Sequence, residues 1–84
     1  MTIEEIQEIN PDALVCDGFD EAIIGMAERI NLGPVVAYDV DKMIDIMVER
    51  DGMTHEEALE YFNFNILGAW MGEFTPVFIS KNTF

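Results

Sequence analysis

Two helix-start signals, separated by a short break, constrain the fold of this chain more than any other feature. Asp39 has the position and chemistry of an N-cap, because apolar residues follow it at helical spacing. After a glycine-containing break, Thr54 and Glu57 form the pattern of a capping box, in which each residue can satisfy a backbone amide of the other. The sequence therefore predicts a helical pair, about 40–51 and 54–65. The short turn forces the pair to pack as a hairpin or a steeply angled corner.

Runs of β-prone residues before and after the helical pair predict a small sheet. Two such runs flank a turn rich in Asn, Gly and Pro. The sequence therefore predicts an antiparallel hairpin over residues 22–38. A third strand is expected at about 74–79. It should begin at Pro76 or lie on an edge, because proline cannot donate to a ladder. With a short N-terminal helix that ends at Asn10-Pro11, the predicted fold is one α+β domain over 1–84, its antiparallel sheet packed on the helical pair.

The charge of the chain excludes several classes of partner. Seventeen Asp and Glu residues against four Lys and Arg residues give a formal net charge of −13, while 50% of the residues are hydrophobic. Such a chain is apolar enough to fold but repels phosphate backbones and anionic lipids, so we expect no nucleic-acid and no membrane partner. The first residues lack the basic and apolar regions of a secretory signal. We therefore expect a cytoplasmic protein.

The residues with potential chemistry do not form a recognisable catalytic or metal-binding pattern. The cluster of Asp17 and Asp20, with Asp39 further along, is the best candidate for a metal site or for acid–base catalysis, but its spacing matches no calcium loop. Turn-forming and capping roles explain these residues better. His55 should lie in solvent at the start of a helix, and the acidic surroundings of Cys16 should raise its pKa. The prediction is a non-enzymatic protein without catalytic, cofactor-binding or metal-binding residues.

The region 61–74 holds five of the nine aromatic residues. One helix and one strand cannot bury all five rings on a single face, so some of them should be exposed, as at a protein interface. The alternative is that these rings simply build the core. The candidate interaction residues are aromatic and acidic: Asp17, Asp20, Tyr38, Asp39, Tyr61, Phe64, Trp70, Glu73 and Phe74.

Several separated blocks of sequence point to a family. They read DGFDEAIIG at 17–25, ERDGMTHEEA at 49–58 and FNFNILGAWMGEFTPVF at 62–78. In this order they resemble a family of small, uncharacterised proteins that tailed bacteriophages and some bacterial genomes encode. The resemblance implies a phage-type accessory protein in a bacterial host cytoplasm, and it brings no catalytic residues with it.

Three functional hypotheses remain open from the sequence. The leading one is an accessory protein that binds and modulates a bacterial host protein, in its sharpest form by an acidic surface that mimics DNA. The second is a small-ligand, nucleotide-type binding or sponge protein, in which Tyr38, Trp70 and Phe74 line a pocket. The third is a structural or interaction module. A homodimer is a further expectation, since an exposed edge at 77–79 would allow sheet extension.

Overall fold

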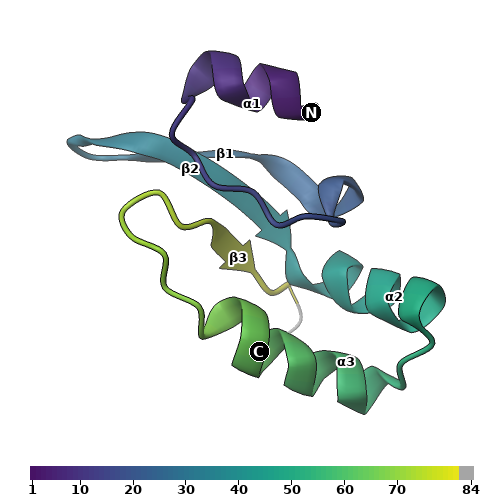
Figure 1. Cartoon of the computed structure of the whole chain (residues 1–84). Helices are drawn as coiled ribbons and strands as arrows, with labels where there is room; N and C mark the ends of the chain where they lie inside the picture. The colour runs from purple at the N-terminus through teal and green to yellow at the C-terminus, as the bar shows by residue number, and fades with distance from the viewer. Residues whose placement is uncertain (82–84) are drawn as a thin grey trace.

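The computed structural model describes residues 1–81, and its three strands form one sheet in the order β1-β2-β3 (Figure 1). β1 (Ile23–Arg29) and β2 (Leu32–Asp39) pair antiparallel, which confirms the predicted hairpin. β3 (Val77–Ile79) follows Pro76 directly and occupies an edge of the sheet. Both features agree with the restriction that proline places on a strand.

The sheet is mixed, whereas the sequence predicted an antiparallel one. β3 runs parallel to β2, with Val77 opposite Ala37. The direction follows from the path of the chain, which turns back twice between the two strands: the helices run in opposite senses, and the loop 68–76 returns along the sheet before β3 begins (Figure 1). A short strand carries no local signal for its direction, and for this reason the predicted antiparallel direction of the third strand was wrong.

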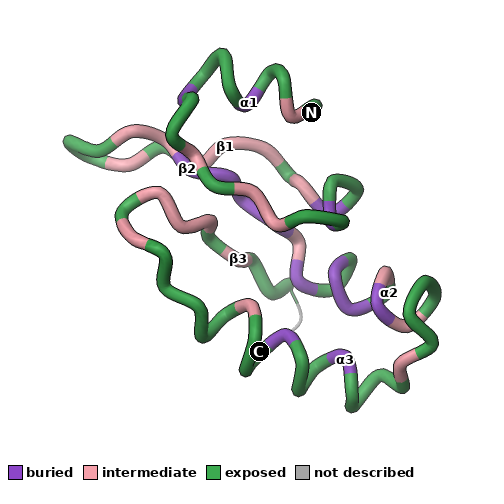
Figure 2. The backbone as a smooth tube through the Cα atoms, viewed as in Figure 1, coloured by how far each residue is buried: buried purple, intermediate pink, exposed green. Residues whose placement is uncertain are grey.

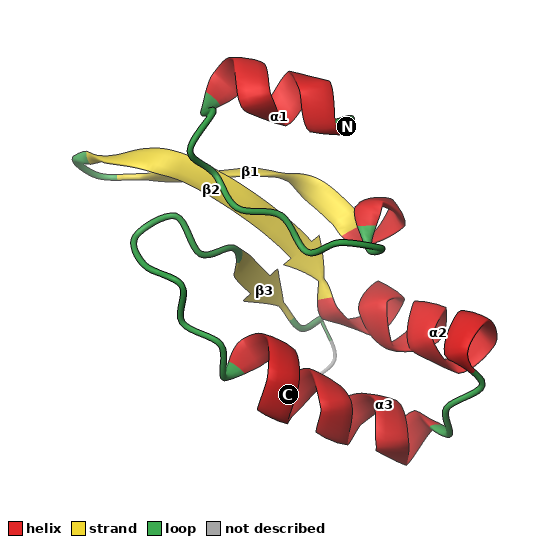
Figure 3. Cartoon of the chain, viewed as in Figure 1, coloured by secondary structure: helices red, strands yellow, loops and turns green. Residues whose placement is uncertain are grey.

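The predicted helical pair is present, and with it the α+β fold is confirmed (Figure 3). α2 (Val40–Asp51) begins where the side chain of Asp39 accepts a hydrogen bond from the amide of Lys42 at 3.2 Å. It ends at Gly52, whose φ of 69° is left-handed and favours glycine. α3 (His55–Tyr61) begins at the predicted capping box. A π-helical segment, η2 (Phe62–Leu67), continues α3 two residues beyond the predicted end at 65.

The N-terminal segment contacts the rest of the chain through a buried side chain and through hydrogen bonds. α1 (Ile3–Ile9) has a capping box of its own between Thr2 and Glu5, and Ile6 is its buried residue. The side chain of Asn10 then donates a hydrogen bond to the carbonyl oxygen of Pro34 in β2 at 2.8 Å. The chain continues to the short 3-10 helix η1 (Asp20–Ala22), which leads into β1.

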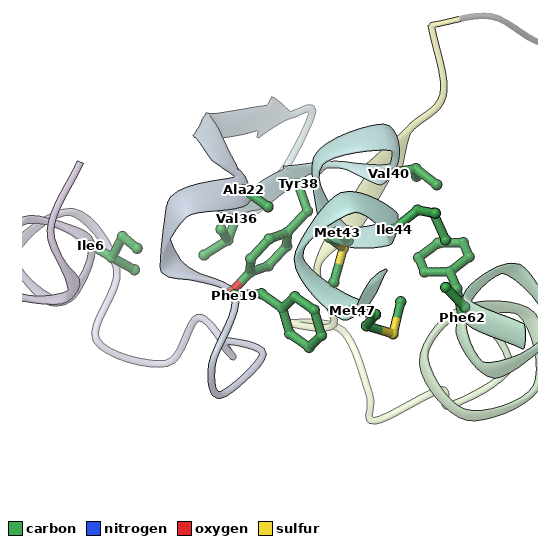
Figure 4. Close-up of a cluster of buried hydrophobic side chains, with 11 residues drawn as sticks. Ile6, Phe19, Ala22, Val36, Tyr38, Val40, Met43, Ile44, Met47 and Phe62 are labelled. Carbon is green, nitrogen blue, oxygen red and sulfur yellow. The ribbon is translucent and has the colours of Figure 1, made fainter. Parts of the chain in front are cut away.

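The hydrophobic core lies between β2 and the helical pair, and burial is concentrated on these elements (Figure 2). Side chains of α2 lie between Tyr38 on one side and Phe62 on the other (Figure 4). The ring of Phe78 in β3 closes this core, with its centroid 6.0 Å from that of Tyr38 and 5.4 Å from that of Phe62. The buried cluster is Ile6, Phe19, Ala22, Val36, Tyr38, Val40, Met43, Ile44, Met47, Ala58 and Phe62.

Across residues 1–81, every helix is too short or too polar to span a bilayer.

Candidate functional site

Tyr38, one of the predicted interaction residues, is a core residue. Its side chain is 0% exposed, and its hydroxyl oxygen accepts a hydrogen bond from the amide of Cys16 at 2.7 Å. Burial raises the pKa of Tyr38 to about 12. The same environment affects Cys16, whose pKa is raised chiefly by burial, in the direction that the sequence predicted. The hydroxyl of Tyr38 is therefore buried and engaged within the fold, and Cys16 is half-buried beside it.

Asp39 also has a structural role. Besides capping α2, its carboxylate pairs with the ammonium group of Lys81 at 2.9 Å. The hydrogen bond from Lys81 lowers the pKa of Asp39, and the amide of Lys42 adds to this effect. Asp39 therefore joins the start of α2 to the chain after β3, and its charge is compensated locally.

Asp17 and Asp20 are exposed near the end of α2, beside an arginine that is already engaged. The guanidinium of Arg50 donates to the carbonyl oxygen of Gly18 at 2.6 Å and lies 5.1 Å from the centre of the Phe19 ring. A hollow of about 480 Å³ opens here, lined by Gly18, Asp20, Glu21, Ile46, Glu49 and Arg50. In the described part of the chain, no group of three or more Asp, Glu, His or Cys side chains is arranged to hold a metal ion.

The largest exposed apolar side chains follow one another along α3, η2 and the loop after it. Phe64 is 80% exposed, Trp70 is 74% exposed and Tyr61 is 45% exposed, in agreement with the expectation that part of this aromatic region faces solvent. Leu67 and Met71 are exposed beside them in the sequence. We refer to Tyr61, Phe64, Leu67, Trp70 and Met71 as the apolar ridge.

Glu73 and Phe74 anchor the loop that carries the end of the ridge. The backbone oxygen of Glu73 accepts a hydrogen bond from the guanidinium of Arg29 at 2.6 Å, and that of Phe74 accepts one from the amide of Leu14 at 3.1 Å. The ring of Phe74 is half-buried, while the side chain of Glu73 is exposed. Of these two residues, only Glu73 offers a fully exposed side chain to a partner.

The ridge borders a groove on α3 that also contains carboxylates. The α3 groove has a volume of about 350 Å³ and is lined by Met53, Glu57, Glu60, Tyr61, Phe64 and Asn65. Glu57 accepts a hydrogen bond from the amide of Thr54 at 2.9 Å, which lowers its pKa and keeps it ionised at neutral pH. The sequence analysis did not include Glu57, Glu60 or Met53 among the candidates. The helical spacing of 57, 60, 61 and 64 was the signal that could have grouped them.

Along the helical stretch formed by α3 and η2, aromatic residues two positions apart lie on opposite faces. Phe62 is buried and Ile66, four residues later, is partly buried, while Phe64 between them faces solvent. π-Helical turns are rare and are frequent at functional sites. Phe62 and Ile66 thus pack in the core, while Phe64 is exposed as part of the ridge.

A third cavity, of about 230 Å³, is mainly apolar. It lies where the segment 14–16 meets η2 and the chain around β3. The three rings of the ligand hypothesis do not line it: Tyr38 is in the core, Trp70 is exposed and Phe74 is half-buried elsewhere. The lining residues are Leu14, Val15, Cys16, Asn65, Ile66, Ala69, Met71, Thr75, Pro76 and Phe78.

Searches against protein-family models, curated proteins and solved structures found no match to this chain.

Proposed function

We propose that the protein is a non-enzymatic accessory protein that binds and modulates a basic bacterial host protein through the apolar ridge and the acidic residues around it. The observation that carries this proposal is the exposure of Phe64 and Trp70, of which Phe64 lines the α3 groove together with the carboxylate residues Glu57 and Glu60. Exposed aromatic residues within a polar rim are typical of protein interfaces. The phage-type context comes from the sequence resemblance, and with it the host cytoplasm as the place of action.

The charge distribution supports a basic partner. Three of the four cationic side chains are engaged within the protein: Arg29 donates to backbone oxygens, Arg50 pairs with Asp51, and Lys81 pairs with Asp39. With four Lys and Arg residues for seventeen Asp and Glu residues, the acidic side chains far outnumber the basic ones. The resulting negative field attracts a basic surface and speeds its association at low ionic strength. In its most specific form, the proposal is that the acidic surface of this protein mimics DNA and occupies a host site that binds DNA phosphates.

The apolar ridge and the acidic field contribute differently to binding. Full burial of a large apolar side chain contributes about 1.5–3 kcal/mol, whereas an exposed ion pair contributes roughly 0–1 kcal/mol. The rings of Phe64 and Trp70 should therefore determine how long a complex lasts. The carboxylates should determine how fast it forms and how strongly salt weakens it.

Affinity capture from a bacterial lysate at low and high salt, followed by mass spectrometry, tests the proposal. The variant Phe64→Ser/Trp70→Ser should lose the captured host protein, because it removes the two most exposed rings of the ridge. The matched control is Ile24→Ser/Ile30→Ser on the β1–β2 hairpin, where Ile30 is 88% exposed. It should capture as the wild type does.

Three results distinguish the versions of the proposal. Equal capture by both double variants would show that the ridge is not the interface. Capture that is unchanged at high salt would remove DNA mimicry but keep an apolar interface. Capture of no specific protein by the wild type would contradict the proposed function as a whole.

The apolar cavity near β3 favours a second candidate function, the binding of a small ligand. Its lining is mainly aliphatic and aromatic, which suits an apolar ligand better than a nucleotide. Native mass spectrometry of the purified protein should then show a retained small molecule, and Ala69→Leu, which adds bulk to the lining, should remove it. A bare protein mass and no thermal shift with nucleotides would reject this candidate.

A further inference from the structure

We propose that the α3 groove binds an arginine side chain of the protein partner. This inference rests on the proposed function and specifies it, because it names the group that the partner contributes. It follows from the aromatic rings and carboxylates that line the groove and from the acidic charge of the chain.

The groove has the groups that recognise a guanidinium. Tyr61 and Phe64 present ring surfaces, and Glu57 and Glu60 present carboxylates, within one groove of about 350 Å³. A planar guanidinium stacks on an aromatic ring and donates two parallel hydrogen bonds to a carboxylate, whereas an ammonium group acts as a point charge. Met53 offers a flexible apolar surface on which the methylene stem of an arginine can lie.

The protein already contains an arginine in such surroundings. The guanidinium of Arg50 lies 5.1 Å from the centre of the Phe19 ring and also pairs with Asp51 at 3.0 Å. The α3 groove presents the same two kinds of group to solvent. None of the described residues that line it is basic, and in our proposal an arginine of the partner supplies the complementary cation.

The surroundings of the groove favour a protein partner over free arginine. The volume of the groove is at the lower end of small-ligand sites, which suits one side chain. Phe64 is 80% exposed and Trp70 is 74% exposed, and a single amino acid is too small to cover both rings. A partner that inserts an arginine into the groove can cover the rest of the ridge with its apolar neighbours. Its positive charge also matches the net charge of −13.

NMR titration of the full chain tests the inference with three probes of similar size. They are the N-acetyl amides of arginine, lysine and citrulline, of which citrulline is the neutral analogue of arginine. The arginine probe should give saturable shifts at the amides of 57–65 and should bind about threefold or more tightly than the lysine probe, the advantage expected of ring stacking. The citrulline probe should give no saturable shift.

Matched variants distinguish specific recognition of arginine by the groove from a general effect of the net charge of the protein. Glu60→Gln and Phe64→Leu should each weaken the arginine probe about threefold or more, because each removes one of the two recognising groups. Glu28→Gln, on the exposed side of β1, makes the same change in net charge and should leave the titration unchanged. Dispersed amide spectra of all three variants establish that they fold.

The inference is overturned if lysine and arginine bind equally, if Phe64→Leu binds as the wild type does, or if the shifts centre on Asp20 and Glu49 in the other acidic hollow. These outcomes are separate from failure of the proposed function. A host protein captured through the ridge without any preference for arginine would overturn this inference alone. Saturable arginine binding at 57–65 without a captured host protein would support the groove and contradict the proposed function.

Discussion

At the scale of single residues, Tyr38 joins three parts of the molecule. Its ring lies against that of Phe78 in β3, its backbone belongs to β2, and its hydroxyl oxygen accepts the hydrogen bond of the Cys16 amide. The segment before β1 thus depends on this hydroxyl for one of its backbone hydrogen bonds. An amide left without its acceptor in partly buried surroundings is unfavourable for the folded state.

Tyr38→Phe should therefore lower the free energy of unfolding at pH 7 by about 1–2 kcal/mol, the range for a lost buried hydrogen bond. Tyr61→Phe removes the same atom from an exposed ring and should stay within about 0.5 kcal/mol of the wild type. Urea unfolding of the three proteins measures both values. Equal effects of the two substitutions would show that the hydroxyl of Tyr38 does not stabilise the fold.

The advantage of the wild type over Tyr38→Phe should also depend on pH. The pKa of Tyr38 in the folded protein is about 12, whereas a tyrosine in an unfolded chain has a pKa of about 10. Because the folded-state value is the higher one, the contribution of the protonated hydroxyl is complete below about pH 10 and is lost as the pH rises towards about 12. The difference in stability between the two proteins should shrink across this interval.

At the scale of elements, α3 is a short helix that depends on its first turn. α3 itself has seven residues, and with η2, which continues it to Leu67, the helical stretch only reaches the length of about 12–15 residues at which isolated helices are marginally stable in water. Its one fully buried residue is Ala58. The hydrogen bonds between Thr54 and Glu57 fix the start of α3 and the place of Glu57 in the α3 groove.

Thr54→Ala should lower the free energy of unfolding by about 1 kcal/mol, the usual effect of removing an N-cap hydroxyl. Thr54→Ser keeps the hydroxyl and is the matched control, which should unfold close to the wild type. Urea unfolding followed by circular dichroism gives both values. If alanine and serine at this position behaved alike, the capping box would not contribute to stability.

The elements that sequence analysis predicted best are those with local signals. The cap at Asp39, the break at Gly52 and the capping box at Thr54 each act within a few residues, and all three bound helices of the structure. The capping box of Thr2 and Glu5 has the same pattern and was not recognised, although the N-terminal helix itself was expected. The π-helical turn of η2 was not foreseen, because such turns are rare and the sequence was interpreted with α-helical spacing.

The candidate site was predicted only in part, and the reason lies in β2. Four consecutive residues of this strand, Val35 to Tyr38, are buried, so the strand has no outward face in this part. Alternation of apolar and polar residues therefore cannot show which side chains of β2 are buried. For this reason Tyr38 was predicted as an interaction residue, although its side chain lies in the core. Phe64 and Trp70 were assigned correctly to the exposed set, because too many rings lie close together for one core.

At the scale of the whole molecule, the dominant feature is charge repulsion. A net charge of −13 on 84 residues opposes the compact state, and added salt screens this repulsion. Salt also weakens the pairs of Arg50 with Asp51 and Lys81 with Asp39, but exposed ion pairs contribute little to stability. The loss from two such pairs should be smaller than the relief of repulsion.

Raising the concentration of sodium chloride from a low value should therefore increase the melting temperature, most steeply at the lowest concentrations. Differential scanning calorimetry at constant pH measures the trend. A flat or falling response would contradict the idea that uncompensated surface repulsion limits stability.

The parallel pairing of β3 with β2 has a consequence for the order in which the protein folds. β1 and β2 are adjacent in the chain and can form their hairpin as a local event, whereas β3 pairs with β2 across the whole of the intervening helical pair. Non-local contacts of this kind form slowly. We therefore expect the three residues of β3 to dock late in folding, so that Phe78 completes a core that the hairpin and helices have already assembled.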